Sequence, residues 1–327
     1  MPHRPSPTLE DVARAADVSR ATASRALAGS ASTPARARVH AAARQLGYTT
    51  NPVARALASG SGVRLAVVVH GRRADVLDDP YVDRVVAAAA RAAAPQGVGV
   101  SASWLPMDRG TPQVLEQLGE DRGVCGVILV NTTERVLAAL PASLRGRVVS
   151  IGIGAPGVPS FDVDNGGAAT TILNHMYASG RRRIAMISGP AWLPCTARPV
   201  EAYRDLMAAT GSPVRVVSGD FSAHSGHRAA AEILRRWPDT DAVYAISDAP
   251  ALGVLAALGS SGVDVPGDIA VAGFDDIPFA ALSTPGLTTA SHPVGRIATA
   301  AAEAVLAGRP APPVTSFGSE LIRRRSA

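Results

Sequence analysis

The chain has 327 residues, a length that exceeds one ordinary core and predicts two or three domains. Its 47% hydrophobic and 18% charged residues describe a folded globular protein and exclude a disordered tail. The formal net charge of +5 is concentrated at one end, because residues 1–58 hold eight arginines and three acids while the remainder balances to zero. A basic terminus on a neutral globule predicts a polyanionic partner that is met by that end alone.

Targeting and redox signals are sparse. No apolar run approaches the roughly 18 residues of a membrane span, and residues 1–10 lack the apolar core of a signal peptide, so we expect a cytoplasmic protein with no membrane partner. Cys125 and Cys195 lie far apart without a Cys/His cluster, which favours buried thiols in a reducing compartment over structural zinc. All basic residues are arginine, whose planar fork of donors suits guanine edges and phosphates.

The first predicted element is a short helix after Thr8. Residues 8–11 read Thr-Leu-Glu-Asp and have the form of a capping box, and apolar side chains then recur along one helical face to Ala16. Asp17 tolerates the left-handed backbone of a tight turn, and Val18 is a candidate buried plug. The pattern therefore predicts a helix that ends in a three-residue turn.

The second and third helices complete a helix-turn-helix unit. Ser19 can cap a helix over residues 19–27, in which Ala23 and Leu27 face inward. The opposite face carries Arg20, Ala21, Ser24 and Arg25. A third helix begins with Pro34 at its first position and ends at Gly47, and its apolar residues are expected to close the core: Val39, Ala42, Ala43 and Leu46. The tight turn, the helix caps, the third helix and the positive charge together predict a DNA-binding headpiece.

The body of the chain alternates buried strands with helical stretches. We expect a helix over residues 81–94 and strands over residues 64–70, 98–103, 124–130, 148–153, 183–188, 214–218, 242–246 and 269–272. Strands separated by helices imply parallel sheets of the doubly wound type. No signature of a hydrolase, P-loop, zinc protease or dinucleotide site is present, so no catalytic residue, metal ligand or cofactor is predicted. The pair His224 and His227 fits the start of a helix better than a zinc site.

Motifs spread over nearly the whole chain resemble the lactose-repressor (LacI/GalR) family. The headpiece contributes Thr8-Leu9-Glu10-Asp11-Val12-Ala13, Val18-Ser19, Ser24-Arg25, Leu46-Gly47-Tyr48 and Asn51-Pro52-Val53-Ala54-Arg55-Ala56-Leu57. The body contributes Phe161-Asp162-Val163-Asp164-Asn165, Ser247-Asp248, Val265-Pro266-Gly267-Asp268, Gly273-Phe274-Asp275-Asp276-Ile277-Pro278 and Leu287-Thr288-Thr289. The resemblance implies an all-α helix-turn-helix headpiece joined to a two-lobed α/β domain like type I periplasmic sugar-binding proteins.

The resemblance also implies how DNA is contacted. The second helix would lie in the major groove with Arg20 and Ala21 at its base-reading start and Arg25 on a guanine. Ser19, Thr22 and Ser24 would hydrogen-bond phosphates, and Thr8 is a further expected DNA contact. Two departures from the family pattern limit this transfer: Ala21 offers only a methyl group to a base edge, and the loop of residues 28–32 is about two residues short.

Residues 51–62 are expected to form a hinge helix and a linker. The resemblance implies that this helix folds in the minor groove when two subunits meet on DNA, with Asn51, Val53 and Ala54 as contacts. Leu57 would wedge into the central base step, and the alternative of a core leucine is disfavoured because Ser59-Gly60-Ser61-Gly62 follows at once.

The remaining domain boundaries follow from the same resemblance. Residues 1–50 form the headpiece and 63–327 the effector-binding and dimerisation domain, with an N-lobe of about 63–163 and 291–318 and a C-lobe of about 164–290 and 319–327. An effector, a sugar or related metabolite, would bind between the lobes. Homodimers, or tetramers, would bind a pseudo-palindromic operator, and the chain has no leucine-heptad tail, which favours the dimer.

Five residues are the expected effector contacts. Asp275 matches the family's ligand-binding aspartate at a strand end, with a turn aspartate as the alternative, and Asp248 lies in another such loop. Tyr81 is a candidate aromatic platform, and Phe161 could stack on a ligand or belong to the core. Pro199 stands at the position of the family's ligand arginine, and a one-residue shift could let the neighbouring Arg198 replace that arginine. A pocket so altered leaves two readings open: an effector-controlled repressor, and a regulator that uses a co-repressor or has no effector response. A transporter's solute-binding protein shares the body but has no use for a basic headpiece.

Overall fold

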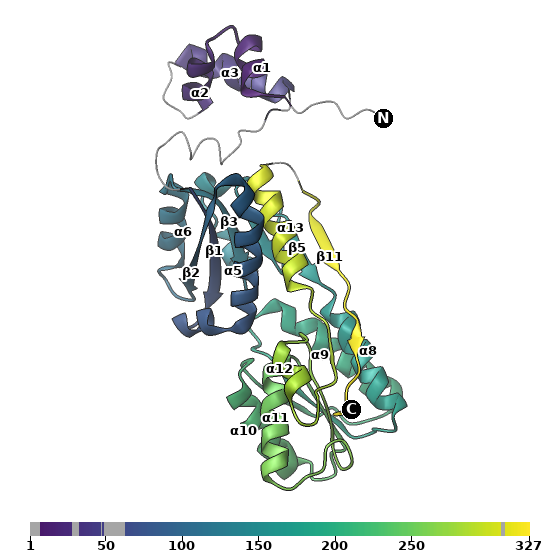
Figure 1. The fold of residues 1–327 in the computed structure, drawn as a ribbon. Coiled ribbons are helices and arrows are strands. Elements are labelled where there is room, and N and C mark those ends of the chain that lie inside the picture. Colours follow the sequence, from purple (N-terminus) through teal and green to yellow (C-terminus); the bar gives the residue numbers. More distant parts are fainter. Residues whose placement is uncertain (1–6, 28–32, 47, 49–62, 309–310) are drawn as a thin grey trace, which may run out of the picture.

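The structure of the protein is a computed structural model that describes residues 7–27, 33–46, 48, 63–308 and 311–327. It contains a helical headpiece and two α/β lobes (Figure 1). We call the six-stranded sheet with its helices the N-lobe and the four-stranded sheet with its helices the C-lobe. The expected fold class, a helix-turn-helix unit on a two-lobed body of parallel sheets, is confirmed.

Three helices form the headpiece: α1 (Leu9–Ala15), α2 (Arg20–Leu27) and α3 (Thr33–Leu46). They share a small apolar core made of Val12, Ala13, Ala16, Ala23, Ala26, Val39, Ala42 and Ala43. Leu46 was expected in this core, but its residue is 39% exposed. Tyr48 packs there instead, and its backbone N–H donates to the carbonyl of Ala43 at 2.9 Å. The last three residues of α3, 44–46, are therefore exposed to solvent.

The N-lobe sheet is parallel throughout, with the order β11-β5-β4-β3-β1-β2. Its strands are β1 (Arg64–Gly71), β2 (Gly99–Pro106), β3 (Val124–Val130), β4 (Val148–Ile151), β5 (Ser160–Val163) and β11 (Val314–Phe317). Alternate residues of β1 pack into different cores, because successive side chains of a strand point to opposite faces. Leu65, Val67 and Val69 face one side, and Ala66 and Val68 the other. Each buried Val or Leu contributes roughly 1.5–3 kcal/mol to folding.

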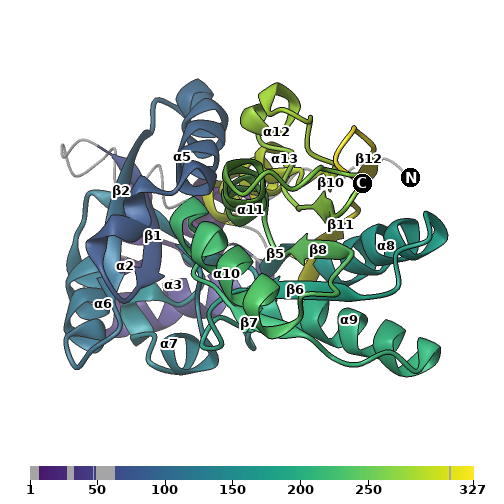
Figure 2. The ribbon, with the colours of Figure 1, turned by 90° about the horizontal axis from the view of Figure 1, so that it is seen from below.

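Helices cover both faces of this sheet (Figure 2). The core on the first face contains residues of α5 (Pro80–Ala93) and α13 (Val294–Ala307), and the core on the other contains residues of α6 (Thr111–Glu120) and α7 (Glu134–Ala138). Three short 3-10 helices complete the lobe: η1 (Ala74–Asp78), η2 (Ala94–Gln96) and η3 (Ala142–Leu144). A sheet covered on both faces explains why its central strands read as unbroken apolar runs.

The C-lobe repeats this layered design with the parallel order β7-β6-β8-β9. Its strands are β6 (Ile184–Ser188), β7 (Val216–Ser218), β8 (Ala242–Ala245) and β9 (Ala270–Ala272). One face packs on α8 (Asn165–Ala178) and α9 (Ala197–Thr210), and the other on α10 (Ala223–Arg236) and α11 (Asp248–Ser260). The short helices η4 (Pro194–Thr196) and α12 (Pro278–Leu282) lie in loops.

Helices α10 and α11 pack so closely that their backbones are in contact. A Cβ atom on Gly226 would collide with the backbone of Pro250, and one on Gly253 would collide with the carbonyl of Ala223. Any other residue at either position would push the two helices apart. His224 lies in the first turn of α10 and His227 directly follows it, in agreement with the prediction of a helix start there.

The chain passes between the lobes at three places. It crosses from β5 into α8, from β10 (Thr289–Ala290) into α13, and from β11 to β12 (Leu321–Ile322), which pairs antiparallel with β10. Strands β5, β10, β11 and β12 were not predicted. They span two to four residues, and β11 alternates between exposed and half-buried side chains, so no apolar run marks them. No helix in the described part of the chain is long and apolar enough to cross a membrane.

Candidate DNA-binding face and interlobe pocket

Local capping sets the geometry of the first two helices. The Thr8 hydroxyl accepts from the backbone N–H of Asp11 at 3.3 Å, and the Asp11 carboxylate accepts from the N–H of Thr8 at 2.9 Å, which confirms the predicted capping box. Asp17 has φ of 51°, the left-handed turn conformation that its position predicted. The Ser19 hydroxyl then accepts from the N–H of Thr22 at 3.2 Å and so begins α2.

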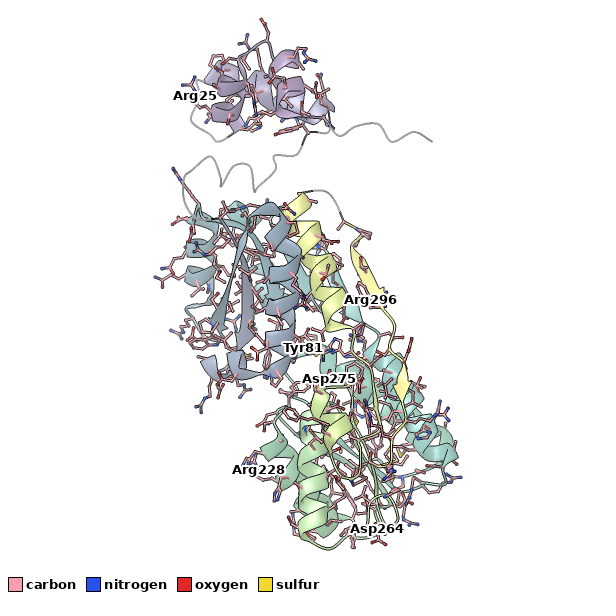
Figure 3. The ribbon with its side chains drawn as sticks, viewed as in Figure 1. Arg25, Tyr81, Arg228, Asp264, Asp275 and Arg296 are labelled. Carbon is pink, nitrogen blue, oxygen red and sulfur yellow. The ribbon has the colours of Figure 1, made fainter. Side chains whose placement is uncertain are left out.

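Helix α2 presents a polar, basic face to solvent. Arg20, Ala21, Ser24 and Arg25 are all exposed, as their spacing predicted, while the opposite face is buried in the headpiece core. The Nε atom of Arg20 lies 3.9 Å from Oε2 of Glu10 on α1, with both side chains largely exposed. Figure 3 shows Arg25 on this helix. Arginine and small polar side chains on an exposed helix face suit the edges of bases in the major groove, and the DNA roles of these residues stay predictions.

The other expected DNA contacts divide into two groups. Ser19 is exposed and Thr22 half-buried, and their hydroxyls lie 2.9 Å apart at the first turn of α2. The hinge residues Asn51, Val53, Ala54 and Leu57 lie outside the residues that the structure describes.

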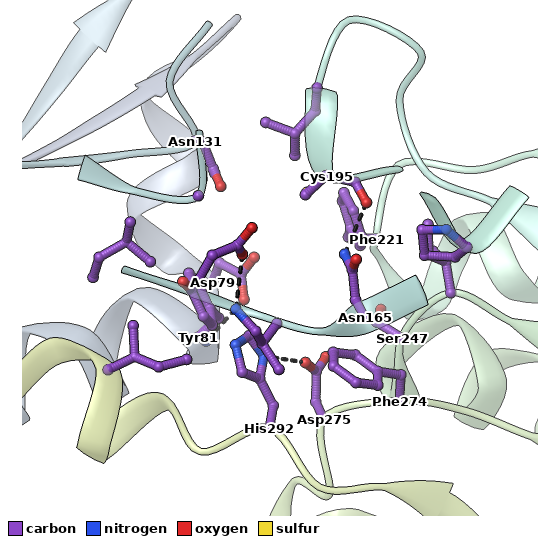
Figure 4. Close-up of a pocket in the computed structure, with 18 of the residues that line it drawn as sticks. Asp79, Tyr81, Asn131, Asn165, Cys195, Phe221, Ser247, Phe274, Asp275 and His292 are labelled. Atoms are coloured by element: carbon purple, nitrogen blue, oxygen red, sulfur yellow. Dashed lines mark hydrogen bonds and ion pairs between the residues drawn. The ribbon is translucent and has the colours of Figure 1, made fainter. Parts of the chain in front are cut away.

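A pocket lies between the two lobes (Figure 4). The N-lobe lines it with the start of α5, including Asp79, Tyr81 and Arg84, and with Asp162 of β5. The C-lobe contributes Asn165 at the start of α8 and residues from the loops that follow its strands. The pocket therefore lies at the carboxyl ends of the parallel strands, where open α/β sheets bind ligands.

Asp275 and Tyr81 meet at this pocket through His292. The Asp275 carboxylate lies 2.8 Å from Nδ1 of His292, whose ring stacks on Tyr81 with centroids 5.3 Å apart. Asp275 has φ of 120°, in the region that favours glycine, which stores strain at a site that projects a carboxylate into the pocket. The structure thus brings two predicted effector residues together (Figure 3).

Asp248 does not line the pocket, contrary to expectation. The residue is 0% exposed, and its two carboxylate oxygens accept from the Thr289 hydroxyl at 2.6 Å and from the N–H of Ile277 at 2.9 Å. Burial, followed by the negative charge of Asp275, raises the pKa of Asp248 to about 8. This carboxyl group holds the loop that carries Asp275, and a ligand cannot reach it here.

Phe161 and Arg198 also lie outside the pocket lining. Phe161 is 4% exposed and belongs to the large apolar core, the alternative weighed for it from sequence. The guanidinium of Arg198 donates to the carboxylate of Asp162 at 2.7 Å. Arg198 therefore pairs with a carboxylate that lines the pocket, but does not line the pocket itself. This ion pair joins α9 of the C-lobe to β5 of the N-lobe.

Several lining residues were missed by the sequence interpretation, above all His292, Asp162 and Asn165. Asp162 and Asn165 belong to a motif quoted for the family resemblance, and that motif was the available signal. His292 lies in the crossing between β10 and α13, where no periodic pattern points to a site. In the described residues, no cluster of three or more His, Cys, Asp or Glu side chains could hold a metal ion.

A helix-turn-helix headpiece followed by a two-lobed α/β domain with a pocket at its strand ends defines a class, the DNA-binding regulators with a small-molecule-binding body. Family models agree: residues 8–51 match that of bacterial regulatory proteins of the lacI family, and 173–327 that of a periplasmic binding protein-like domain.

Relatives extend the match to almost the whole chain. The HTH-type transcriptional regulator CelR of Thermobifida fusca is 33% identical over 317 residues, which cover 90% of this chain and 89% of that protein. A structure described as a transcriptional regulator CelR–cellobiose complex aligns with a TM-score of 0.69 at 29% identity, over 98% of this chain and 100% of that one. The lac repressor dimer bound to operator and the anti-inducer ONPF shares the fold, with a TM-score of 0.70 at 23% identity over 98% of this chain and 99% of that one. The chain belongs to the lacI family and is a DNA-binding transcriptional regulator, not an enzyme.

Proposed function

We propose that the protein is a cytoplasmic repressor that binds a pseudo-palindromic operator as a homodimer and is controlled by a small molecule in the interlobe pocket. Two copies of α2, one duplex turn apart, would read the two half-sites, with Arg20, Ala21 and Arg25 toward the bases. The solved lac repressor complex, a dimer on operator, supports this arrangement. The CelR complex, which holds cellobiose, supports a hydroxyl-rich effector.

The observation that carries the effector role is that both lobes line one pocket. Tyr81 and Asp162 come from the N-lobe, and Asn165 and Asp275 from the C-lobe. A ligand that touches all four binds best at one angle between the lobes, and a ligand that prefers one arrangement shifts the population toward it. Such a change would move the two hinge segments of a dimer relative to each other and alter the affinity for operator.

A regulator that uses a co-repressor is the second candidate. Pro199 at the position of the family's ligand arginine favours it, because Pro199 lines the pocket without offering a donor. The two candidates differ in sign: an inducer weakens operator binding, and a co-repressor strengthens it.

The test begins with operator selection from a pool of random duplexes by the full chain. We expect enriched sites with two inverted half-sites about 10 bp apart, centre to centre. Sedimentation should find two chains per duplex. Adding sugars and sugar alcohols to this complex then gives the sign of the response. Asymmetric sites that bind one chain would overturn the dimeric repressor.

A further inference from the structure

The pocket carries more negative than positive charge. Three lining residues are carboxylates: Asp79, Asp162 and Asp275. Arg198 is paired with Asp162 at 2.7 Å, and the guanidinium of Arg84 donates to the backbone carbonyls of Asp275 at 3.3 Å and His292 at 3.0 Å. Asp79 has no ion pair with any described residue. It accepts one hydrogen bond, from the N–H of Tyr81 at 2.9 Å, as the N-cap of α5.

The pKa values of groups at the pocket reflect this excess of negative charge. Burial, with the charges of Asp162 and Asp275 added, raises the pKa of the Cys195 thiol to about 12. Burial raises the pKa of Asp79, and the negative charges of Asp275 and Asp83 raise it further. The pocket thus resists a further negative charge and favours a positive one.

An orphaned acceptor gives independent evidence for a donor on the ligand. Asn165 is 9% exposed, and its Nδ2 donates to the carbonyl of Cys195 at 2.8 Å, while its Oδ1 has no hydrogen-bond partner. Thr132, another lining residue, is 3% exposed and has an unpartnered hydroxyl. Leaving such a buried group unpaired costs about 1–3 kcal/mol, which a ligand that donates to it would recover.

Aromatic rings line the same space. Tyr81, Phe221 and Phe274 border the pocket together with the carboxylates (Figure 4). Ring faces attract cations, and the attraction strengthens where water is excluded. Carboxylates, ring faces and an unpaired amide oxygen together match a ligand that donates hydrogen bonds and carries positive charge.

We propose, on the basis of the effector role proposed above, that this pocket binds a polyhydroxylated ligand with a protonated amino group, which lies near Asp79. Hydroxyl groups of the ligand satisfy Asn165 and Thr132, and the ammonium neutralises the carboxylate that has no cationic partner. The same charges reject sugar acids and sugar phosphates.

The test compares matched ligands by calorimetric titration of the full chain, at a pH where the amine is protonated. D-glucosamine should bind at least about tenfold more tightly than D-glucose, because a single ammonium–carboxylate contact near a protein surface exceeds that difference. D-glucuronate should not bind. The variant Asp79→Asn keeps the N-cap, since asparagine caps equally well, and should abolish the preference for the amine. The control Asp83→Asn changes an exposed carboxylate on the same helix and should retain it.

Three results would overturn the proposal: equal affinity for the amine and its hydroxyl counterpart, a preference that survives Asp79→Asn, or tight binding of D-glucuronate. Binding of D-glucose alone overturns the amine proposal and leaves the effector pocket standing. If none of the three ligands binds, both fail, and operator binding by the same preparation shows whether the repressor function remains. Circular dichroism melts establish that each variant is folded.

Discussion

The headpiece and the interlobe pocket place their charges in opposite ways. In the headpiece the side chains of Arg14 and Arg20 are 76% and 74% exposed, and they surround a core of small apolar residues. In the pocket the side chains of Asp162 and Asp275 are 15% and 19% exposed and face a space between two lobes. One region exposes its charges to water, where DNA would meet them, and the other encloses its charges in the pocket in which we propose that a small molecule binds.

That contrast has an energetic consequence. The arginines Arg14 and Arg20 of the headpiece are largely exposed to solvent, so their contribution to DNA affinity would come through counterion release and depend strongly on salt. The carboxylates of the pocket are partly desolvated, so their interactions with other charges are stronger and less screened by salt. Substitutions in the two regions should therefore separate cleanly, one set acting on DNA affinity and the other on ligand response.

The largest expected effect is on Asp275. Replacing it with alanine should abolish the effector response while the affinity of the ligand-free protein for operator stays within about twofold, because the carboxylate lies in the pocket. Titration of a preformed operator complex with an active ligand measures this. A variant that still responds would remove Asp275 from the ligand site.

The next effect concerns pH and Asp248. Its pKa of about 8 in the folded state exceeds the ordinary value of 3.8, so the folded protein keeps a proton that the unfolded chain has released between those values. The free energy of unfolding should fall as pH rises from about 4 to about 8, by on the order of 2–5 kcal/mol. Asp248→Asn should flatten this slope in urea titrations, and Asp205→Asn, an exposed carboxyl on α9, should not. An unchanged slope in Asp248→Asn would assign it to other groups.

Arg25 tests the headpiece side of the comparison. Arg25→Ala should cost about 1–3 kcal/mol on the operator and relax the preference at one base pair. The control Arg14→Ala, an exposed arginine on α1, should weaken operator and random DNA to the same small extent. Electrophoretic mobility shifts on operator and on random DNA measure both affinities. An equal loss of affinity for the two duplexes in Arg25→Ala would contradict base reading by Arg25.

The smallest effect is the loss of one helix cap. Thr8→Ala should lower the opening free energy of α1 by about 1 kcal/mol, while Thr8→Ser keeps the hydroxyl that accepts from Asp11. Hydrogen exchange of the α1 amides in the full chain measures the difference. If the serine variant exchanges as fast as the alanine one, the cap is not what stabilises this turn.

Sequence predicted the headpiece almost residue by residue because its signals are local. A capping box, a left-handed Asp17 and the burial pattern of α2 involve neighbours within one or two turns. The prediction that Leu46 is buried was wrong because it also used only local information. Helical spacing places Leu46 on the core face, but it carries no information on Tyr48, which packs there instead. The longer buried strands of both lobes were predicted because they read as apolar runs, whereas the four-residue strand β5 is buried but was not predicted.

The pocket was only half predictable. Asp275 and Tyr81 could be found because the family resemblance marks their positions, one at a strand end and the other beside Asp79-Pro80. His292 and Asn165 matter through partners far away in sequence: Asp275 and Tyr81 for the first, the carbonyl of Cys195 for the second. Asp248 shows the converse, because a loop aspartate beside a strand can point inward and hold a loop as readily as it can bind a ligand.

The three crossings between the lobes also bear on how the body folds. Strand β11 completes the N-lobe sheet by pairing with β5, and the Ser160 hydroxyl donates to the carbonyl of Pro313, 153 residues along the chain. The Ser326 hydroxyl closes the C-lobe in the same way by donating to the carbonyl of Val271 at 2.6 Å. The N-lobe sheet is complete only with β11, which follows all four strands of the C-lobe sheet in sequence. Both lobes therefore depend on contacts between residues that lie far apart in sequence, and such contacts form more slowly than the local contacts within helices.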